Sequence, residues 1–454
     1  MHRAFWEIAL SLEIVSSSKS SEHNMAGHLK TMRQRGENGV IITLVAVFLL
    51  FVVGAMAALS IDIVTFYTAR SEAQLAADSA ALAGARVLAN SGMTSDLNSA
   101  SDNVVTNAEQ MAGAVAVQVA ASNQVGGRTL VAPVSPSYCG QEICVSFNDK
   151  TSPSFLNNPH VTVRVNRSDI PVFFARIWGN TQVSISATAT AEAYNPSGLA
   201  NISSNSSSAP VALTCVKPLV IANLDPLGGS IFDQYGNVLD AGLLGAQFPL
   251  HARCNGGCSP PTPQAWQYFV GNDQTSFPPP TQALPACTGS NFQLGIAGCV
   301  PVPITCGNQV DILLTYDSNL DQDAADAVNC LTHSTNGNGD TASLPPPPFQ
   351  FTMGAENPIV QAGFNPGTPT QTMLSDSLVT IPVSANSPIM GTSVTIVGFV
   401  QLFLQPAGTA AVASSPQYIS SEIINLIGCS SGPAGAPVYG NGPTAVPVRL
   451  ITPP

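Results

Sequence analysis

Charged side chains are scarce in this chain of 454 residues, and basic ones are the scarcest. Only 9% of the residues are Asp, Glu, Lys or Arg, against roughly 25% in an average soluble domain. Lys and Arg number 15 against 27 Asp and Glu, so the formal net charge is −12. A surface with so few cations neutralises few phosphates, which argues against nucleic acid and anionic lipid as partners.

Catalytic and metal-binding motifs are also missing from the sequence. It contains no G-x-S-x-G, H-E-x-x-H or P-loop pattern, and its six histidines are scattered. The acidic stretch from Asp311 to Asp326 lacks the spacing of a calcium loop, so a solvated face is expected there. We therefore expect no enzyme activity, no cofactor and no metal site.

Long apolar runs are absent except for one near the N-terminus. Residues 40–59 read VIITLVAVFLLFVVGAMAAL, with no charge and with Thr43 as the one polar side chain. A helix of that length crosses the roughly 30 Å hydrocarbon core of a bilayer, so the run predicts a single transmembrane helix. A cleaved signal peptide is the alternative, because the segment from Ala55 to Ala57 resembles a cleavage site, although the run is longer than a usual signal core.

The charges that flank this run predict its orientation. Lys30, Arg33 and Arg35 precede it, whereas the first charge after it is Asp62. Basic flanks remain in the cytoplasm. We therefore expect residues 1–39 to form a cytoplasmic leader, with the bulk of the chain on the other side of the membrane.

All ten cysteines follow the apolar run, as expected for a part of the chain that lies in an oxidising compartment. Two pairs, Cys139 with Cys144 and Cys254 with Cys258, are spaced for local disulfide loops. His251 lies near the second pair, but a zinc site would need a second pair of ligands at the usual spacing, and there is none. Disulfides are the interpretation that we favour, with buried free thiols as the alternative.

The helix is expected to continue past the apolar run to about residue 90. Residues 60–90 contain no proline and are rich in alanine, the best helix former. Small residues recur four positions apart and form a stripe along one side of this helix. The stripe comprises Ala73, Ala77, Ala81 and Ala85, with Ala76, Ala80 and Gly84 beside them.

A stripe of small residues permits close approach, either to a helix of another protein or to the rest of this chain. Asp78 lies in the same segment and is a further helix-packing candidate. Asp62, just beyond the span, either marks the membrane boundary or makes a polar contact with a partner helix.

Periodicity in the rest of the chain predicts an α+β fold. Residues 60–194 are expected to form a small α+β unit, 195–210 a Ser/Asn-rich linker, and 211–454 a β-rich, loop-rich region with many Pro and Gly. Helices are expected at 102–120 and 170–178. Strands are expected at 142–147, 161–166, 183–194, 211–221, 309–316, 378–383 and 394–404, with 446–451 as an edge strand because of Pro447.

The first part of the chain resembles a known family. The leader RGENG at 35–39, the span, Asp62 at its outer end and the segment LAADSAALAGA at 75–85 resemble the TadE/G-like pilus-assembly family, and its TadG-like members in particular. The segment FFARIWG and the SATATAEA strand that follows it are also similar to this family.

The resemblance implies a membrane-anchored structural component of a Tad (Flp, type IVc-like) pilus-assembly or secretion apparatus. It further implies a place in the bacterial inner membrane, with most of the chain in the periplasm or outside the cell, and other pilus-assembly proteins as partners. A membrane-anchored cell-surface adhesin or binding module is the alternative function.

Overall fold

The computed structural model places most of the chain beyond residue 34. The described residues are 35–95, 102–148, 158–172, 174–175, 179, 182–195, 211–234, 236–252, 267–271, 287–298, 302–313, 318–334, 339–343, 350–363, 369–371, 375–406, 419–429, 438–440 and 446–451. The chain divides into two compact units, one that ends at Ile61 and one that begins at Asp62.

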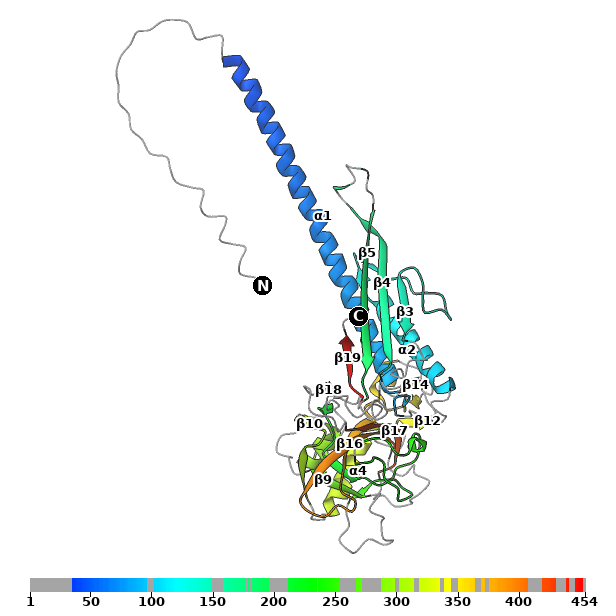
Figure 1. The fold of residues 1–454 in the computed structure, drawn as a ribbon. Coiled ribbons are helices and arrows are strands. Elements are labelled where there is room, and N and C mark those ends of the chain that lie inside the picture. Colours follow the sequence, from blue (N-terminus) through cyan, green and yellow to red (C-terminus); the bar gives the residue numbers. More distant parts are fainter. Residues whose placement is uncertain are drawn as a thin grey trace, which may run out of the picture. The chain divides into compact units, whose positions relative to one another are not determined.

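The longest element is α1 (Arg35–Ala89), a helix of 55 residues that passes through the boundary between the two units (Figure 1). The prediction that the helix continues past the apolar run to about residue 90 is confirmed. Alanine and the absence of proline explain its length. It ends where Asn90, Ser91 and Gly92 follow, and Gly92 has a φ of 75°, a left-handed conformation that glycine adopts at little cost.

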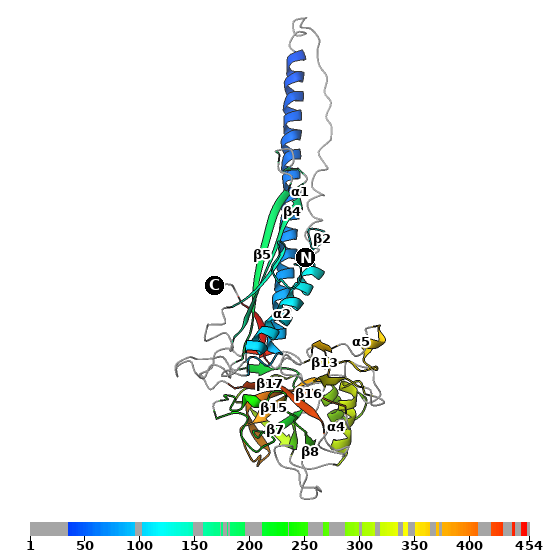
Figure 2. The ribbon, with the colours of Figure 1, turned by 90° about the vertical axis from the view of Figure 1, so that its right-hand side faces the viewer.

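The C-terminal half of α1 belongs to a two-layer α+β arrangement. One layer is α1 with α2 (Asp102–Ser122), and the other is an antiparallel sheet in the order β19-β5-β4-β3. Figure 2 shows the long strands β4 and β5 beside α1. The sheet strands are β3 (Ile143–Phe147), β4 (His160–Pro171), β5 (Gln182–Ala193) and β19 (Val448–Ile451), and β1 (Gln124–Val125) with β2 (Arg128–Thr129) forms a separate ribbon.

Alternation of small or branched apolar residues with polar ones explains this sheet. Val161, Val163 and Val165 of β4 are fully buried, while residues between them are exposed or half-buried. The strand β5 was predicted and is confirmed, but burial alternates only as far as Ala189, because Thr190 and Glu192 are buried as well. The prediction of a helix at 170–178 is wrong for its first residues, because β4 continues to Pro171 in antiparallel pairing with β5. Most of the rest of that segment lies outside the described residues.

Strand β19 was predicted as an edge strand, and it is one, but its partner is β5 of the first sheet. Val448 pairs with Ala193, and Arg449 forms an ion pair with Glu192. The chain therefore returns from its C-terminal region to the sheet that flanks α1.

The region beyond residue 210 contains a closed ring of five strands. Strands β7 and β9 pair, β9 pairs with β11, β11 with β16, β16 with β15, and β15 returns to β7. The strands that make or flank the ring are β7 (Leu219–Ala222), β8 (His251–Ala252), β9 (Gln267–Gly271), β11 (Gln309–Leu313), β15 (Leu378–Ser384), β16 (Ser393–Leu404) and β17 (Ser421–Gly428). The prediction that residues 394–404 form a buried central strand is confirmed by β16, which pairs with β11, β15 and β17.

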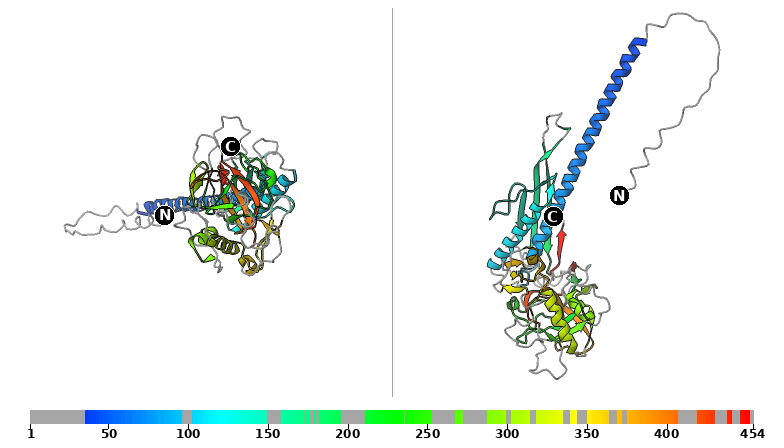
Figure 3. Two further views of the ribbon diagram at one scale, coloured as in Figure 1. Left: turned by 90° about the horizontal axis from the view of Figure 1, so that it is seen from below. Right: turned by 180° about the vertical axis from the view of Figure 1, so that it is seen from behind.

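The strand expected at 211–221 is two short strands, because Cys215 has a left-handed φ of 61° and Pro218 lacks an N–H to donate. Shorter elements complete the region, and Figure 3 shows the ribbon of the chain from two further directions. They are β6 (Val211–Leu213), η3 (Ala241–Leu243), α3 (Asn291–Ala297), β10 (Ile304–Thr305), α4 (Ser318–Leu331), β12 (Thr341–Ser343), β13 (Gln350–Thr352), α5 (Pro358–Gln361), β14 (Pro369–Gln371) and β18 (Val438–Gly440).

One hydrophobic core joins the two halves of the second unit. Ala85 of α1 and Val163 of β4 belong to the same buried cluster as Val211, Phe399 and Ile427. A second cluster fills the space between the strand ring and α3 and α4.

Candidate membrane anchor and packing surface

The N-terminal part of α1 presents apolar side chains on all sides. From Val40 to Phe51 nearly every side chain is large, apolar and exposed, with Leu50 the most exposed at 78%. Consecutive residues of a helix point in all directions, so no polar face is left for water. A helix of this length that is apolar all round fits the hydrocarbon core of a bilayer, and residue 40 begins the one candidate span among the described residues.

Asp62 lies three residues beyond the apolar run 40–59, and it is buried rather than exposed. Only 1% of its surface is accessible. Its Oδ2 accepts hydrogen bonds from the backbone N–H groups of Phe174, at 3.1 Å, and Ala175, at 2.9 Å. The carboxylate thus contacts the chain just beyond the end of β4 in its own unit, whereas the sequence offered a membrane boundary or a partner helix.

The small-residue stripe of α1 packs inside the second unit. Ala73, Ala76, Ala77, Ala80, Ala81 and Ala85 are all fully buried. Gly84 marks the closest approach, because a Cβ at this position would lie 3.0 Å from Cγ1 of Val161 in β4 and 3.3 Å from Cβ of Ala116 in α2. The stripe therefore seats α1 against both α2 and the sheet of this chain.

Two side chains beside the stripe, Asp78 and Leu75, are not fully buried. Asp78 is half-buried and accepts a hydrogen bond of 2.7 Å from Gln74 Nε2 one turn earlier. Leu75 is 65% exposed, so it does not flank the buried stripe.

Beyond its last turn, α1 is tied to β16 and β17 by buried polar side chains. Asn425 of β17 donates to the carbonyl of Ala89 and accepts from Ser95 Oγ. Gln401 of β16 donates to Oδ1 of Asn90 at 3.2 Å. The bond from Asn425 satisfies the Ala89 carbonyl, a backbone group at the end of α1, and these bonds together fix the end of α1 to β16 and β17.

Neither Asn425 nor Gln401 was singled out from the sequence. Each is the single polar residue of an apolar stretch within its strand, IINLIG in β17 and VQLFL in β16. A buried polar residue in such a strand needs a hydrogen-bond partner, and that pattern is the signal that points to them.

Replacing Asn425 by alanine is expected to destabilise the second unit by about 1–3 kcal/mol, because Ala89 and Ser95 would lose their buried partner. Thermal unfolding of the full chain in detergent measures this change. Asn386→Ala is the matched control, since Asn386 is exposed. Equal unfolding temperatures for both variants would contradict the role given to Asn425.

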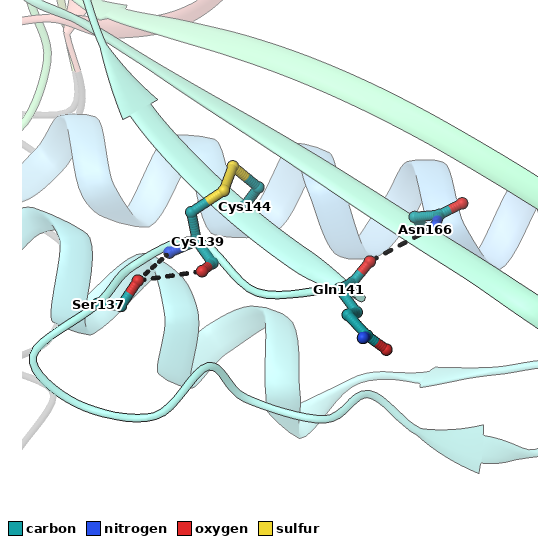
Figure 4. Close-up of a disulfide and its surroundings, with 5 residues drawn as sticks. All are labelled: Ser137, Cys139, Gln141, Cys144 and Asn166. Carbon is teal, nitrogen blue, oxygen red and sulfur yellow. Dashed lines mark hydrogen bonds between the residues drawn. A yellow bond between two sulfur atoms is a disulfide. The ribbon is translucent and has the colours of Figure 1, made fainter.

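One of the two local cysteine pairs expected from the spacing, Cys139 with Cys144, forms a disulfide (Figure 4). Ser137 Oγ bonds to the backbone of Cys139 and holds the loop before β3. Cys254 and Cys258 lie outside the described residues.

Two long-range disulfides were not assigned from the sequence. They join Cys287 to Cys330, next to α3 and at the end of α4, and Cys306 to Cys429, which follow β10 and β17.

The acidic stretch expected as a solvated face lies largely on α4. Asp326 accepts a hydrogen bond of 2.9 Å from Gln322, and Asp323 accepts one from Ser290, the residue that caps α3. Within the described part of the chain, no three His, Cys, Asp or Glu side chains lie close enough together to hold a metal ion.

A buried histidine beyond the end of α4 ties several loops together. His333 Nδ1 lies 2.9 Å from Oδ2 of Asp340, and Asn357 also donates to Asp340. Burial alone would lower the pKa of His333, but its hydrogen bonds to Asp340 and Asp376 raise that pKa to about 9. These contacts fasten the end of α4 to the start of α5, which is a structural role.

Glu422 in β17 is a second buried ionisable group. Burial raises its pKa to about 7, and a hydrogen bond from Gln405 only partly opposes this shift. Because the folded pKa lies above the unfolded value of 4.5, the protonated form is the one that the fold favours. The stability that Glu422 contributes is present below pH 4.5 and is lost as the pH rises through 7.

Glu422→Gln is therefore expected to unfold at a higher temperature than the wild type at pH 8 and at a similar temperature near pH 4.5. Glu142→Gln is a control of opposite sign. Burial opposes the shift, but hydrogen bonds from Arg128 and Val131 lower the pKa of Glu142, so its removal destabilises the protein at pH 8. A Glu422→Gln variant that is less stable than the wild type at pH 8 would show that the charged form is tolerated.

Taken together, these features define a chain with one candidate membrane span, whose helix α1 continues from the apolar segment into the packed α+β body. Residues 39–87 match the family model described as “Putative Flp pilus-assembly TadE/G-like”. The match begins just before the apolar segment and ends near the end of α1, so it confirms the TadE/G-like resemblance for this part of the chain. Comparisons with curated proteins and with solved structures found no match.

Proposed function

We propose that this protein is a membrane-anchored structural component of a Tad (Flp) pilus-assembly apparatus in the bacterial inner membrane. The observation that carries the proposal is the coincidence of the family match with α1. The matched residues contain both the exposed apolar segment and the buried alanine stripe. In this proposal α1 holds the second unit at the membrane, where other assembly proteins bind it.

The connection between α1 and the strand ring supports a structural role rather than a catalytic one. The alanine stripe, the buried hydrogen bonds of Asn425 and the shared core all hold the end of α1 rigidly in the second unit.

The proposed orientation has residues 1–39 in the cytoplasm and the second unit in the periplasm, with the cysteine pairs in an oxidising compartment. Protease added to spheroplasts is expected to digest the second unit. Protection of that unit until the membrane is permeabilised would reverse the orientation.

Deletion of the gene in a host that makes Flp pili tests the function. We expect pili to disappear from electron micrographs and to return when the intact gene is restored. Normal pili together with lost surface adhesion would instead support the alternative function, an anchored adhesin or binding module. Asn386→Ala, which changes an exposed side chain, is the matched control for complementation.

A further inference from the structure

The exposed apolar surface of α1 does not end with the apolar run. Ile61, Ile63, Val64 and Tyr67 are 51%, 41%, 63% and 72% exposed. From there on, the next exposed positions are polar or charged, namely Thr68, Arg70, Ser71 and Gln74. The change from apolar to polar surroundings along α1 therefore occurs at about Tyr67, two turns later than residue 59.

Asp62 lies inside this stretch, but its charge does not face outward. Its side chain is buried, and its Oδ2 is occupied by the N–H groups of Phe174 and Ala175. A carboxylate that accepts two backbone hydrogen bonds on the body side leaves mainly apolar side chains on the opposite side, where the exposed Ser60 donates its hydroxyl to the Met56 carbonyl of the same helix at 2.9 Å. Asp62 is thus no barrier to lipid on that side.

The apolar surface of α1 is long enough to cross the hydrocarbon core with its outer boundary at Val64. Residues 40–64 of α1 would extend about 37 Å, which exceeds the roughly 30 Å hydrocarbon core by several ångströms. Tilt absorbs such an excess. With Val64 at the boundary, Tyr67 lies about 4–5 Å further along the helix, within the headgroup layer, and Leu75 lies about 16 Å further, outside it.

We propose that the outer hydrocarbon boundary lies at Val64, and that the chain just beyond the end of β4 sits in the lipid headgroup layer beside Tyr67. In this arrangement the chain has two membrane contacts, α1 itself and the pair Phe174 and Ala175, both of which are half-buried. Their N–H groups would otherwise meet a layer poor in water, and the Asp62 carboxylate satisfies them. This inference rests on the proposed membrane anchor.

The surface fits lipid better than a partner helix. A helix–helix seam is a narrow stripe of the helix surface. Here Ile61, Ile63, Val64 and Tyr67 cover nearly half of the helix circumference, the half opposite buried Asp62 and Ala69. An exposed tyrosine followed by the arginine at position 70 is also the order expected at a membrane interface, where the ring lies among headgroups and the cation extends to water.

Photo-cross-linking of the full chain in phosphatidylcholine vesicles tests the inference. Benzoylphenylalanine replaces Phe51, Tyr67, Phe174 or Leu75, one at a time, and lipid adducts are measured by mass spectrometry after illumination. We expect lipid adducts at positions 51, 67 and 174 and none at 75. Leu75 is the matched control because it is an exposed apolar residue of the same helix.

Different failures of this experiment have different meanings. Adducts at 51 without adducts at 67 and 174 would overturn the inference and leave the anchor intact. Adducts to protein instead of lipid at 67 and 174 would also overturn it, in favour of a partner surface. No lipid adduct at any position would overturn both the inference and the proposed anchor.

Asp62→Ala and Asp62→Asn add a test of the role given to the carboxylate. The amide of the Asp62→Asn variant keeps an acceptor oxygen, so this variant should retain the lipid adducts at position 174. Asp62→Ala should reduce them several-fold while adducts at position 67 remain. Equal adduct yields at 174 in both variants would show that Asp62 does not hold this contact.

Discussion

Replacing Ala77 or Ala81 by leucine is expected to remove most of the folded protein from the membrane. Both alanines are fully buried where α1 packs inside the second unit. Each substitution adds three carbon atoms at a packed site, which costs about 1–3 kcal/mol or more. Domains are stable by only roughly 5–15 kcal/mol, so the double variant should lose most of its stability. Immunoblots of the membrane fraction and thermal unfolding in detergent measure the effect.

Ser71→Leu is the matched control, because Ser71 lies on the exposed side of the same helix. It should leave the protein level unchanged. If Ala77→Leu and Ala81→Leu accumulate normally but abolish pili, the stripe contacts another protein in the assembled apparatus. Normal levels and normal pili in both variants would contradict its role as a packing surface.

Loss of the disulfide between Cys306 and Cys429 is expected to have the second large effect. These cysteines are 123 residues apart and follow β10 and β17, so their bond closes a long loop of the unfolded chain. In the chain-entropy description, such a bond contributes about 4–5 kcal/mol, against about 2 kcal/mol for a loop of five residues. The double variant Cys306→Ala and Cys429→Ala should therefore unfold at a much lower temperature than the wild type.

The control is the double variant Cys139→Ala and Cys144→Ala, whose loop spans five residues. Its unfolding temperature should fall less. Equal losses in the two variants would show that local packing rather than loop closure determines the stability that each disulfide contributes.

The elements that local sequence determines were predictable. Alanine-rich composition without proline predicted α1, and a run of branched and aromatic residues predicted β16. In both cases the signal lies within the segment itself. The strands β15 and β5 follow the same rule, although the alternation predicted for β5 holds only as far as Ala189.

The contacts that join distant segments were not predictable in the same way. Asp62 meets residues more than a hundred positions later, Asn425 meets the end of α1, and β19 pairs with β5. The sequence pattern of a single aspartate after an apolar run is the same whether its side chain faces water, a partner protein or its own chain. Closure of the five-strand ring likewise depends on the pairing of β9 with β11, which no local pattern specifies.

The pairing of β19 with β5 has a consequence for biogenesis. In the proposed orientation, the chain crosses the membrane behind its N-terminal anchor, so β5 emerges long before residues 448–451. Until those residues arrive, β5 has an open edge of unpaired backbone groups, which is a template for pairing with another chain. In the proposed orientation, the sheet is therefore completed only after translocation has reached β19, and until then the open edge of β5 is accessible to a chaperone or to a strand of another chain.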